Sequence, residues 1–242
     1  MDWLLDLKRD FILCFVTEER WRYLVSGLGN TLRITSLAVL MGIAIGIVVA
    51  VIRVSYDKNS AQMHGASRGL LTLANAVSHI YLAVIRGTPV VVQLMISYYI
   101  IFASSRNGVA VATLAFGINS GAYVAEIFRS GIMAIDEGQF EAGRALGFSY
   151  VDTMRYVVIP QAFKNVLPAL ANEFIVLLKE TSVAGYVTVR DLTMGGDIIR
   201  SVTYSPFLPL LAVAAIYLAM VLFFTWLVSK LEKKLRSTEK RG

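Results

Sequence analysis

Long stretches of this chain carry no charged residue, and they limit it to few architectures. Nineteen uncharged residues run from Ile34 to Ile52, and twenty-nine run from Ser201 to Ser229. A helix needs about 20 apolar residues to cross about 30 Å of hydrocarbon. Because only 17% of the 242 residues are charged and 56% are hydrophobic, the chain lacks the polar surface of a soluble enzyme. These runs predict an integral membrane protein.

Further uncharged runs predict several crossings. Gly87–Ser105 and Asn107–Ala125 have nineteen residues each, and Gly69–Ile85 has seventeen. Asn165–Tyr186 is apolar but contains Glu173, Lys179 and Glu180. We expect helices and not a barrel, because no segment of about ten residues alternates with period two.

Basic residues indicate the orientation, since they favour the cytoplasmic side. The tail from Lys230 is basic, and the long polar segment Arg129–Lys164 is basic in part, so we expect both to be cytoplasmic. If Gly69–Ile85 spans the membrane, the chain has six crossings and its N-terminus is inside. If that segment lies along the inner face or extends the next helix, there are five crossings and the N-terminus is outside. The pattern alone leaves both topologies open.

Several chemistries are disfavoured by what the sequence lacks. A single cysteine, Cys14, excludes an intrachain disulfide and a cysteine metal cluster. No G-x-x-x-x-G-K-[ST] phosphate loop is present, so we expect the chain not to hydrolyse ATP. His64 and His79 lack metal-ligand spacing, and Gly117–Gly121 misses a serine-hydrolase motif by one residue. We therefore expect no enzymatic activity in this chain.

The segment between Asp136 and Pro168 is too long for a simple connection, and its pattern predicts a docking element. Glu137–Leu146 is expected to form a helix that ends at Gly147 in the left-handed conformation. Ser149 and Asp152 form a capping box for a second helix, which Pro160 is expected to stop. The small Ala142 and Gly143 would let a partner approach closely, and Phe140 would offer an aromatic contact for a partner's pocket.

Polar residues inside the predicted spans are candidates for a substrate path, because burying them in lipid is costly without a function. The candidates are Gln93, Asn119, Tyr123, Glu126 and Glu180. The alternative is structural, in that Glu126 could pair with Arg129 one turn later.

Four motifs in order resemble one family. Glu141-Ala142-Gly143, Gly147, Val157 and Ile159-Pro160 are similar to the signature of ATP-binding-cassette (ABC) importer permeases, with three conservative departures. Three further motifs resemble the polar amino-acid subfamily, which imports histidine, arginine, glutamine and their relatives. They are Arg86-Gly87-Thr88-Pro89 with Gln93, Asn119-Ser120-Gly121-Ala122-Tyr123 with Glu126, and Leu178-Lys179-Glu180-Thr181-Ser182.

The resemblance implies an all-α, type I ABC importer permease fold with five transmembrane helices. It selects the topology with the N-terminus outside and the C-terminus cytoplasmic. Residues 1–25 are then an external amphipathic segment, 26–229 the transmembrane permease domain with its coupling loop at 136–164, and 230–242 a basic cytoplasmic tail. We expect a multi-pass protein of the bacterial cell membrane.

The resemblance also implies partners. They are a cytoplasmic ABC ATPase dimer that binds ATP and Mg, an extracytoplasmic amino-acid-binding protein, and a second permease copy or a paralogue, all within membrane lipid and without nucleic acid. Phe140, Glu141, Ala142, Gly143 and Gly147 would couple the permease to the ATPase. The predicted function is ATP-driven import of polar amino acids by alternating access. The alternative is an ATP-independent secondary carrier or channel. The sequence does not name the amino acid or decide between homodimer and heterodimer.

Overall fold

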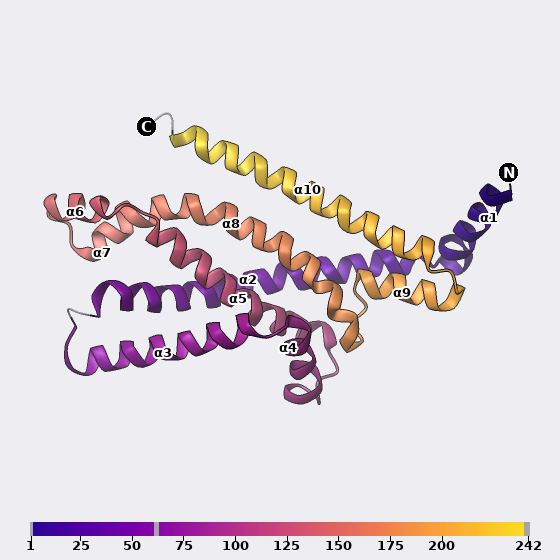
Figure 1. Cartoon of the computed structure of the whole chain (residues 1–242), viewed down its shortest axis with the longest axis horizontal. Helices are drawn as coiled ribbons and strands as arrows, with labels where there is room; N and C mark the ends of the chain where they lie inside the picture. Colours follow the sequence, from indigo (N-terminus) through magenta and orange to yellow (C-terminus); the bar gives the residue numbers. More distant parts are fainter. Residues whose placement is uncertain (1, 61–62, 240–242) are drawn as a thin grey trace. The chain divides into compact units, whose positions relative to one another are not determined.

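A computed structural model describes residues 2–60 and 63–239, and all of its regular structure is helical (Figure 1). Met1 of the N-terminal segment and residues 240–242 of the predicted tail lie outside the described residues. The α-helices are α1 (Asp2–Phe11), α2 (Trp21–Asn59), α3 (Gly65–Gly87), α4 (Val90–Ile96), α5 (Gly108–Met133), α6 (Glu137–Ala145), α7 (Tyr150–Thr153), α8 (Ile159–Glu180), α9 (Leu192–Thr203) and α10 (Phe207–Glu239). Short π-helical turns occupy Ile12–Val16, Ser97–Ile101 and Met154–Val158, and 3₁₀ turns occupy Thr17–Glu19 and Thr181–Val187.

Among the described residues, four helices are long and apolar enough to cross a membrane: α2, α3, α5 and α10. Helix α8 has 22 residues and is therefore about 33 Å long, although it contains charged side chains. The prediction that Gly87–Ser105 forms one complete span is wrong. The helical part, Val90–Ile101, has 12 residues and is only about 18 Å long. The predicted run Ser201–Ser229 is likewise broken, since α9 ends at Thr203 and α10 begins at Phe207.

The prediction that Pro160 stops a helix is also wrong, and the structure shows why. Pro160 is the second residue of α8, directly after the π-helical turn Met154–Val158. A proline cannot donate to the carbonyl four residues earlier and crowds it. In the π turn the N–H of Ile159 instead donates to the carbonyl of Met154, five residues back. The helical path therefore continues, and Pro168, expected near the start of a span, lies inside α8.

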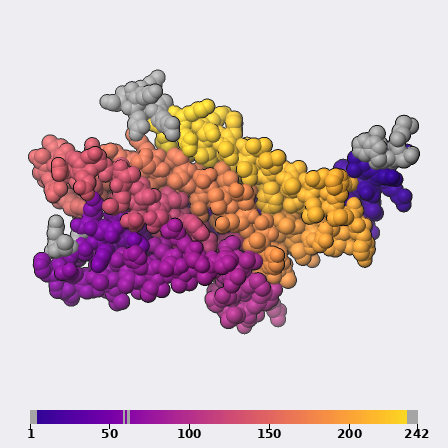
Figure 2. Space-filling view, viewed as in Figure 1, coloured from indigo at the N-terminus to yellow at the C-terminus, as the bar shows by residue number. Residues whose placement is uncertain are grey.

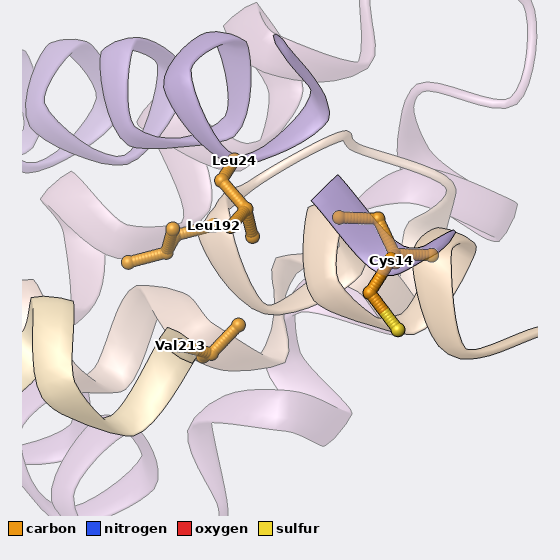
Figure 3. Packing of buried hydrophobic residues seen from close by; sticks show 5 residues of the cluster. Cys14, Leu24, Leu192 and Val213 are labelled. Carbon is orange, nitrogen blue, oxygen red and sulfur yellow. The ribbon is translucent and has the colours of Figure 1, made fainter. Parts of the chain in front are cut away.

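The chain divides into two compact units. The first contains residues 2–38, 90–116 and 175–226, and its core includes Cys14, Leu24, Leu192 and Val213, whose side chains gather between the ribbons in Figure 3. Two glycines permit this packing. A Cβ at Gly27 would clash with the backbone oxygen of Asp191, and one at Gly195 would lie 2.5 Å from the backbone oxygen of Tyr23. Thr31, buried in α2, accepts a hydrogen bond from the N–H of Leu192 at 3.1 Å.

A buried arginine holds the turn that joins the N-terminal helix to α2. Glu18 and Glu19 both have φ near +50°, which is unfavourable for residues other than glycine. Arg20, only 8% exposed, donates to the carbonyl of Leu13 at 2.7 Å and pairs with Glu18 at 3.0 Å. The guanidinium thus ties the two sides of the turn together.

The second unit contains residues 39–89 and 117–174 with the end of α10, and α2, α3 and α5 pack together in it (Figure 1). Val49, Leu82, Ala122 and Ala125 form one of its apolar clusters. Glycines bring α2 and α5 close, because a Cβ at Gly46 would lie 2.5 Å from Cγ1 of Val124. Small residues at such contacts are typical of membrane helices.

Large apolar side chains remain exposed on the candidate spans. On α10, Leu210, Leu218, Leu222 and Trp226 are each about half exposed, and the helix lies open on the face shown in Figure 2. In water such a surface would be unfavourable, whereas a lipid environment accommodates it.

Candidate coupling element and intramembrane pocket

Helix α6 begins and ends as its sequence predicts. Asp136 is the N-cap, and its carboxylate accepts from the N–H of Gly138 at 2.6 Å. Gly147 has φ +81°, and its N–H donates to the carbonyl of Arg144 at 2.9 Å. The N–H of Phe148 donates to the carbonyl of Gly143 at 3.0 Å. These two bonds form a Schellman motif, so Gly147 is the elbow after α6.

Helix α7 follows this elbow and packs back on α6. The hydroxyl of Ser149 caps α7 by accepting from the N–H of Asp152 at 3.2 Å, as predicted. Gly143 is buried, and a Cβ there would lie 2.5 Å from the hydroxyl of Thr153. The small residue thus makes room inside the chain, which corrects the expectation that it makes room for a partner.

Phe140 also differs from its prediction as an outward aromatic contact. Its ring is partly buried and stacks on that of Tyr150, with centroids 6.2 Å apart and planes 15° apart. Nζ of Lys58, at the end of α2, lies 5.0 Å from the same ring and 3.0 Å from the carboxylate of Glu137. One lysine therefore ties α2 to the first two turns of α6.

The surface that α6 and α7 expose is apolar with acidic residues beside it. Glu141 and Ala142 are exposed as predicted, while Leu146 and Val151 are 75% and 69% exposed. Glu141 also lines a groove of about 310 Å³ with Lys58, Glu137, Phe140, Arg144, Tyr150 and Thr153. Sequence analysis did not assign this leucine and this valine to the coupling surface.

A chain of ion pairs runs from α2 through α5 to α3. Arg129 pairs with Asp57 at 3.1 Å and with Glu126 at 3.4 Å, and Glu126 lies 3.9 Å from Arg86. The structural alternative for Glu126, pairing with Arg129, is therefore present in the fold. Arg86 also lies over the ring of Tyr123, 5.8 Å from its centroid.

Tyr123 and Glu126 line one open pocket of about 520 Å³ in the second unit. Its other polar walls are Arg53, His79 and Arg86, which sequence analysis did not assign to a site. Nη1 of Arg53 donates to Nδ1 of His79 at 3.4 Å. Arg53 and Arg86 each directly follow a long uncharged run, and this position in the sequence could have identified them as candidates.

The structure does not gather the other predicted substrate residues into this pocket. Asn119 lies one turn before Tyr123 in α5 and is 2% exposed, so it is buried against other helices. Next to it, Ser120 donates to the carboxylate of Glu173 in α8 at 2.9 Å. Gln93 in α4 and Glu180, the last residue of α8, belong to the first unit.

Comparison with known proteins places this geometry in a family. Residues 65–237 match the model of the binding-protein-dependent transport system inner membrane component. The chain is 34% identical to a putative glutamine transport system permease protein of Rickettsia conorii over 216 residues, covering 88% of this chain and 93% of that one. It is also 34% identical to the arginine transport system permease protein of Bacillus subtilis, over 90% and 94% of the two chains.

A solved structure agrees with these relatives. A chain of an amino acid ABC transporter, crystallised with histidines, has a TM-score of 0.79 and 41% identity, covering 91% of this chain and 98% of that chain. The all-helical architecture is therefore the type I ABC importer permease fold, as predicted, and the protein is a multi-pass membrane protein. With more than two thirds of its length matched, the chain belongs to the family of binding-protein-dependent transport system inner membrane components.

Proposed function

We propose that this chain is the permease subunit of an ABC importer that moves polar amino acids by ATP-driven alternating access. Family membership supports a permease, and the relatives named for glutamine and arginine support the substrate class. The observation that carries the mechanism is the α6–Gly147–α7 element, which has its own caps and an exposed apolar surface. A secondary carrier or channel has no use for such an element.

The proposed topology has five crossings, with residues 1–25 outside and the tail from Lys230 in the cytoplasm. The short helix Val90–Ile101 supports this count, because it cannot cross the membrane alone. Trp21 and Tyr23, 46% and 38% exposed, suit the external interface between the cell membrane and water. The basic residues of the tail suit the inner one.

Membership of the family supports the proposed partners. A cytoplasmic ATPase dimer would bind ATP and Mg and would receive α6 in a groove, with Glu141 as the charged anchor, Ala142 in close contact and Gly147 as the elbow. A binding protein would deliver the amino acid from outside, and a second permease chain would complete the pathway. ATP-driven closure of the ATPases would then favour one of two bundle arrangements by differential binding.

The proposed substrate path uses Gln93, Asn119, Tyr123, Glu126 and Glu180. Tyr123 and Glu126 support it by lining an open pocket with cationic walls. An amino acid offers a carboxylate to such walls and an ammonium to a carboxylate such as Glu126.

The decisive experiment measures ATP turnover after co-purification of the chain with its ATPase and reconstitution with loaded binding protein. We expect glutamine, arginine or a related amino acid to stimulate turnover and uptake, and both to require the ATPase. Uptake that persists in vesicles without the ATPase would favour a secondary carrier instead.

Two variants test the coupling element within that assay. Gly147→Leu forces a β-carbon into φ +81°, and Glu141→Lys reverses the exposed charge. Both should insert into the membrane normally and lose coupled transport. Normal substrate-stimulated ATP turnover in both variants would refute the assignment of α6 to coupling.

A further inference from the structure

The charges around the pocket in the second unit do not balance. Arg86 and Arg129 form an ion-pair chain with the carboxylates of Asp57 and Glu126. Arg53 lines the same pocket outside this chain and leaves one excess positive charge. Arg129 shares both carboxylates, and Arg86 is held by Glu126 alone at 3.9 Å. Among the described residues, Arg53 has no carboxylate within ion-pair distance.

Arg53 also has an unused donor. Its Nε is buried without a hydrogen-bond partner in the described part of the chain, while Nη1 donates to His79 at a long 3.4 Å. A buried guanidinium N–H without an acceptor costs free energy, and one long hydrogen bond to an imidazole nitrogen does not replace a carboxylate partner. Arg53 therefore lines the pocket as an incompletely satisfied cation.

The position of Arg53 makes this imbalance more costly. It is the first charged residue after the nineteen uncharged residues of α2, so it lies where that helix leaves the hydrocarbon. Charged side chains near this depth are expected to have a partner or a function. Leu82, Ala83 and Tyr123 also line the pocket, and the volume of about 520 Å³ suits a small ligand or a lipid headgroup.

We propose that this pocket binds an oxyanion, either a carboxylate or a phosphate, between Arg53 and Arg86. The guanidinium fork matches both groups, and one bound negative charge would neutralise the cluster. Two sources share this chemistry: the carboxylate of the transported amino acid and the phosphate of an anionic membrane lipid. The amino-acid source rests on the proposed function, and the lipid source does not.

The test uses the purified complex of this chain with its ATPase and two pairs of matched probes. Short-chain phosphatidylglycerol is compared with the diacylglycerol that lacks its phosphate, and L-glutamine with L-glutaminol, which lacks the carboxylate. Thermal-shift titration measures the dissociation constants. In at least one pair we expect only the oxyanion to bind, and Arg53→Gln to weaken it about tenfold or more. Binding of phosphatidylglycerol identifies a lipid, and binding of glutamine identifies substrate.

Further variants keep the result independent of folding defects. Arg86→Gln should weaken the same probe, and Arg53→Lys should restore only part of the affinity, because it keeps the charge and loses the fork. Arg200→Gln on α9 removes a charge of the same kind from a partly exposed pair with Asp197 and should change nothing.

Equal affinities in wild type and in both Arg53 and Arg86 variants would overturn the proposal, as would equal binding of the probes that lack the oxyanion. Substrate-stimulated ATP turnover of the wild-type complex is measured in parallel. If turnover is stimulated while the pocket variants bind normally, the oxyanion site fails and the proposed function stands.

Discussion

The carboxylate of Asp191 stabilises α9 as its cap, and its burial costs free energy. Its side chain is fully buried at the start of α9, outside the helices long enough to span the membrane. The carboxylate caps α9 by accepting from the N–H groups of Thr193 at 3.1 Å and Met194 at 3.0 Å. Burial raises the pKa of Asp191, and these hydrogen bonds oppose the rise.

Substitutions of Asp191 should separate the cap from the charge. Asp191→Ala leaves both N–H groups without an acceptor and should lower stability by about 1–2 kcal/mol, measured as the melting temperature in detergent. Asp191→Asn keeps an acceptor oxygen and removes the buried charge, so its melting temperature should equal or exceed that of wild type. A loss with Asn as large as that with Ala would show that the negative charge itself is needed.

The contribution of Asp191 to folding stability changes with pH in one direction. Because the folded pKa of Asp191 is raised, the folded chain binds this proton more readily than the unfolded one, whose pKa is about 3.9. The contribution of this group is therefore most favourable below about pH 3.9 and is lost as pH rises through the folded pKa. The melting temperature of Asp191→Asn relative to wild type should increase across that interval.

At the scale of elements, Lys58 of α2 contacts the start of α6, so its ion pair with Glu137 is placed to affect the proposed coupling. Lys58 is 23% exposed and Glu137 is 84% exposed, so their ion pair contributes no more than about 1 kcal/mol. We expect Lys58→Glu and Glu137→Lys each to reduce substrate-stimulated ATP turnover roughly two- to fivefold, and the double variant to recover part of it.

The control for this pair is Lys233→Glu, which makes the same charge change on an exposed residue of α10. It should leave stimulation unchanged. If the double variant is as impaired as the worse single variant, the pair does not set the position of α6.

The glycine contacts between α2 and α5 give a second prediction at this scale. Gly46→Leu must displace the side chain of Val124 and the adjacent backbone of Ala125, which should cost about 1–3 kcal/mol and lower the melting temperature. Gly29→Leu, in the same helix with open space around it, is the matched control and should be neutral or stabilising. Equal melting temperatures of the two variants would contradict a close contact at Gly46.

The sequence predicted the ends of helices well where the residues that set them lie within one turn. The left-handed ending of α6 at Gly147 acts within one turn and is present as expected, and the structure adds Asp136 as the N-cap. Pro160 misled because a π turn, invisible in the pattern, lets the helix pass it. The early end of the next helix at Ile101 was missed because the length of an uncharged run does not show where a helix stops.

The pocket was predicted only in part for a different reason. Tyr123 and Glu126 share a helix face, so spacing brings them together. Arg53, His79 and Arg86 come from other helices, and only the packing of α2 and α3 against α5 adds them. In the sequence these arginines merely mark the ends of apolar runs.

For the whole molecule, the proposed topology makes a prediction about sidedness. In a Cys14→Ala background, which removes the single and buried thiol, cysteines replace the exposed Lys8 and Lys233. An impermeant thiol reagent should label Lys8→Cys from outside intact cells and Lys233→Cys only after the cells are opened.

Labelling of both positions from the same side would require an even number of crossings and would exclude five. Labelling of Lys8→Cys only after opening, with Lys233→Cys labelled from outside, would show the opposite orientation. Helix α6 would then lie outside the cell, away from the proposed ATPase.

The helical path that passes Pro160 has a mechanical consequence. From Tyr150 through the π turn to Glu180, thirty-one residues are helical without interruption, a rod of about 46 Å. A flexible loop after α6 and α7 would not transmit a displacement of α6 to the rest of the chain. In the proposed coupling, this continuous helix would transmit a displacement of α6 to its far end. The π turn and Pro168, where a hydrogen bond is missing, are the places where it would bend most easily.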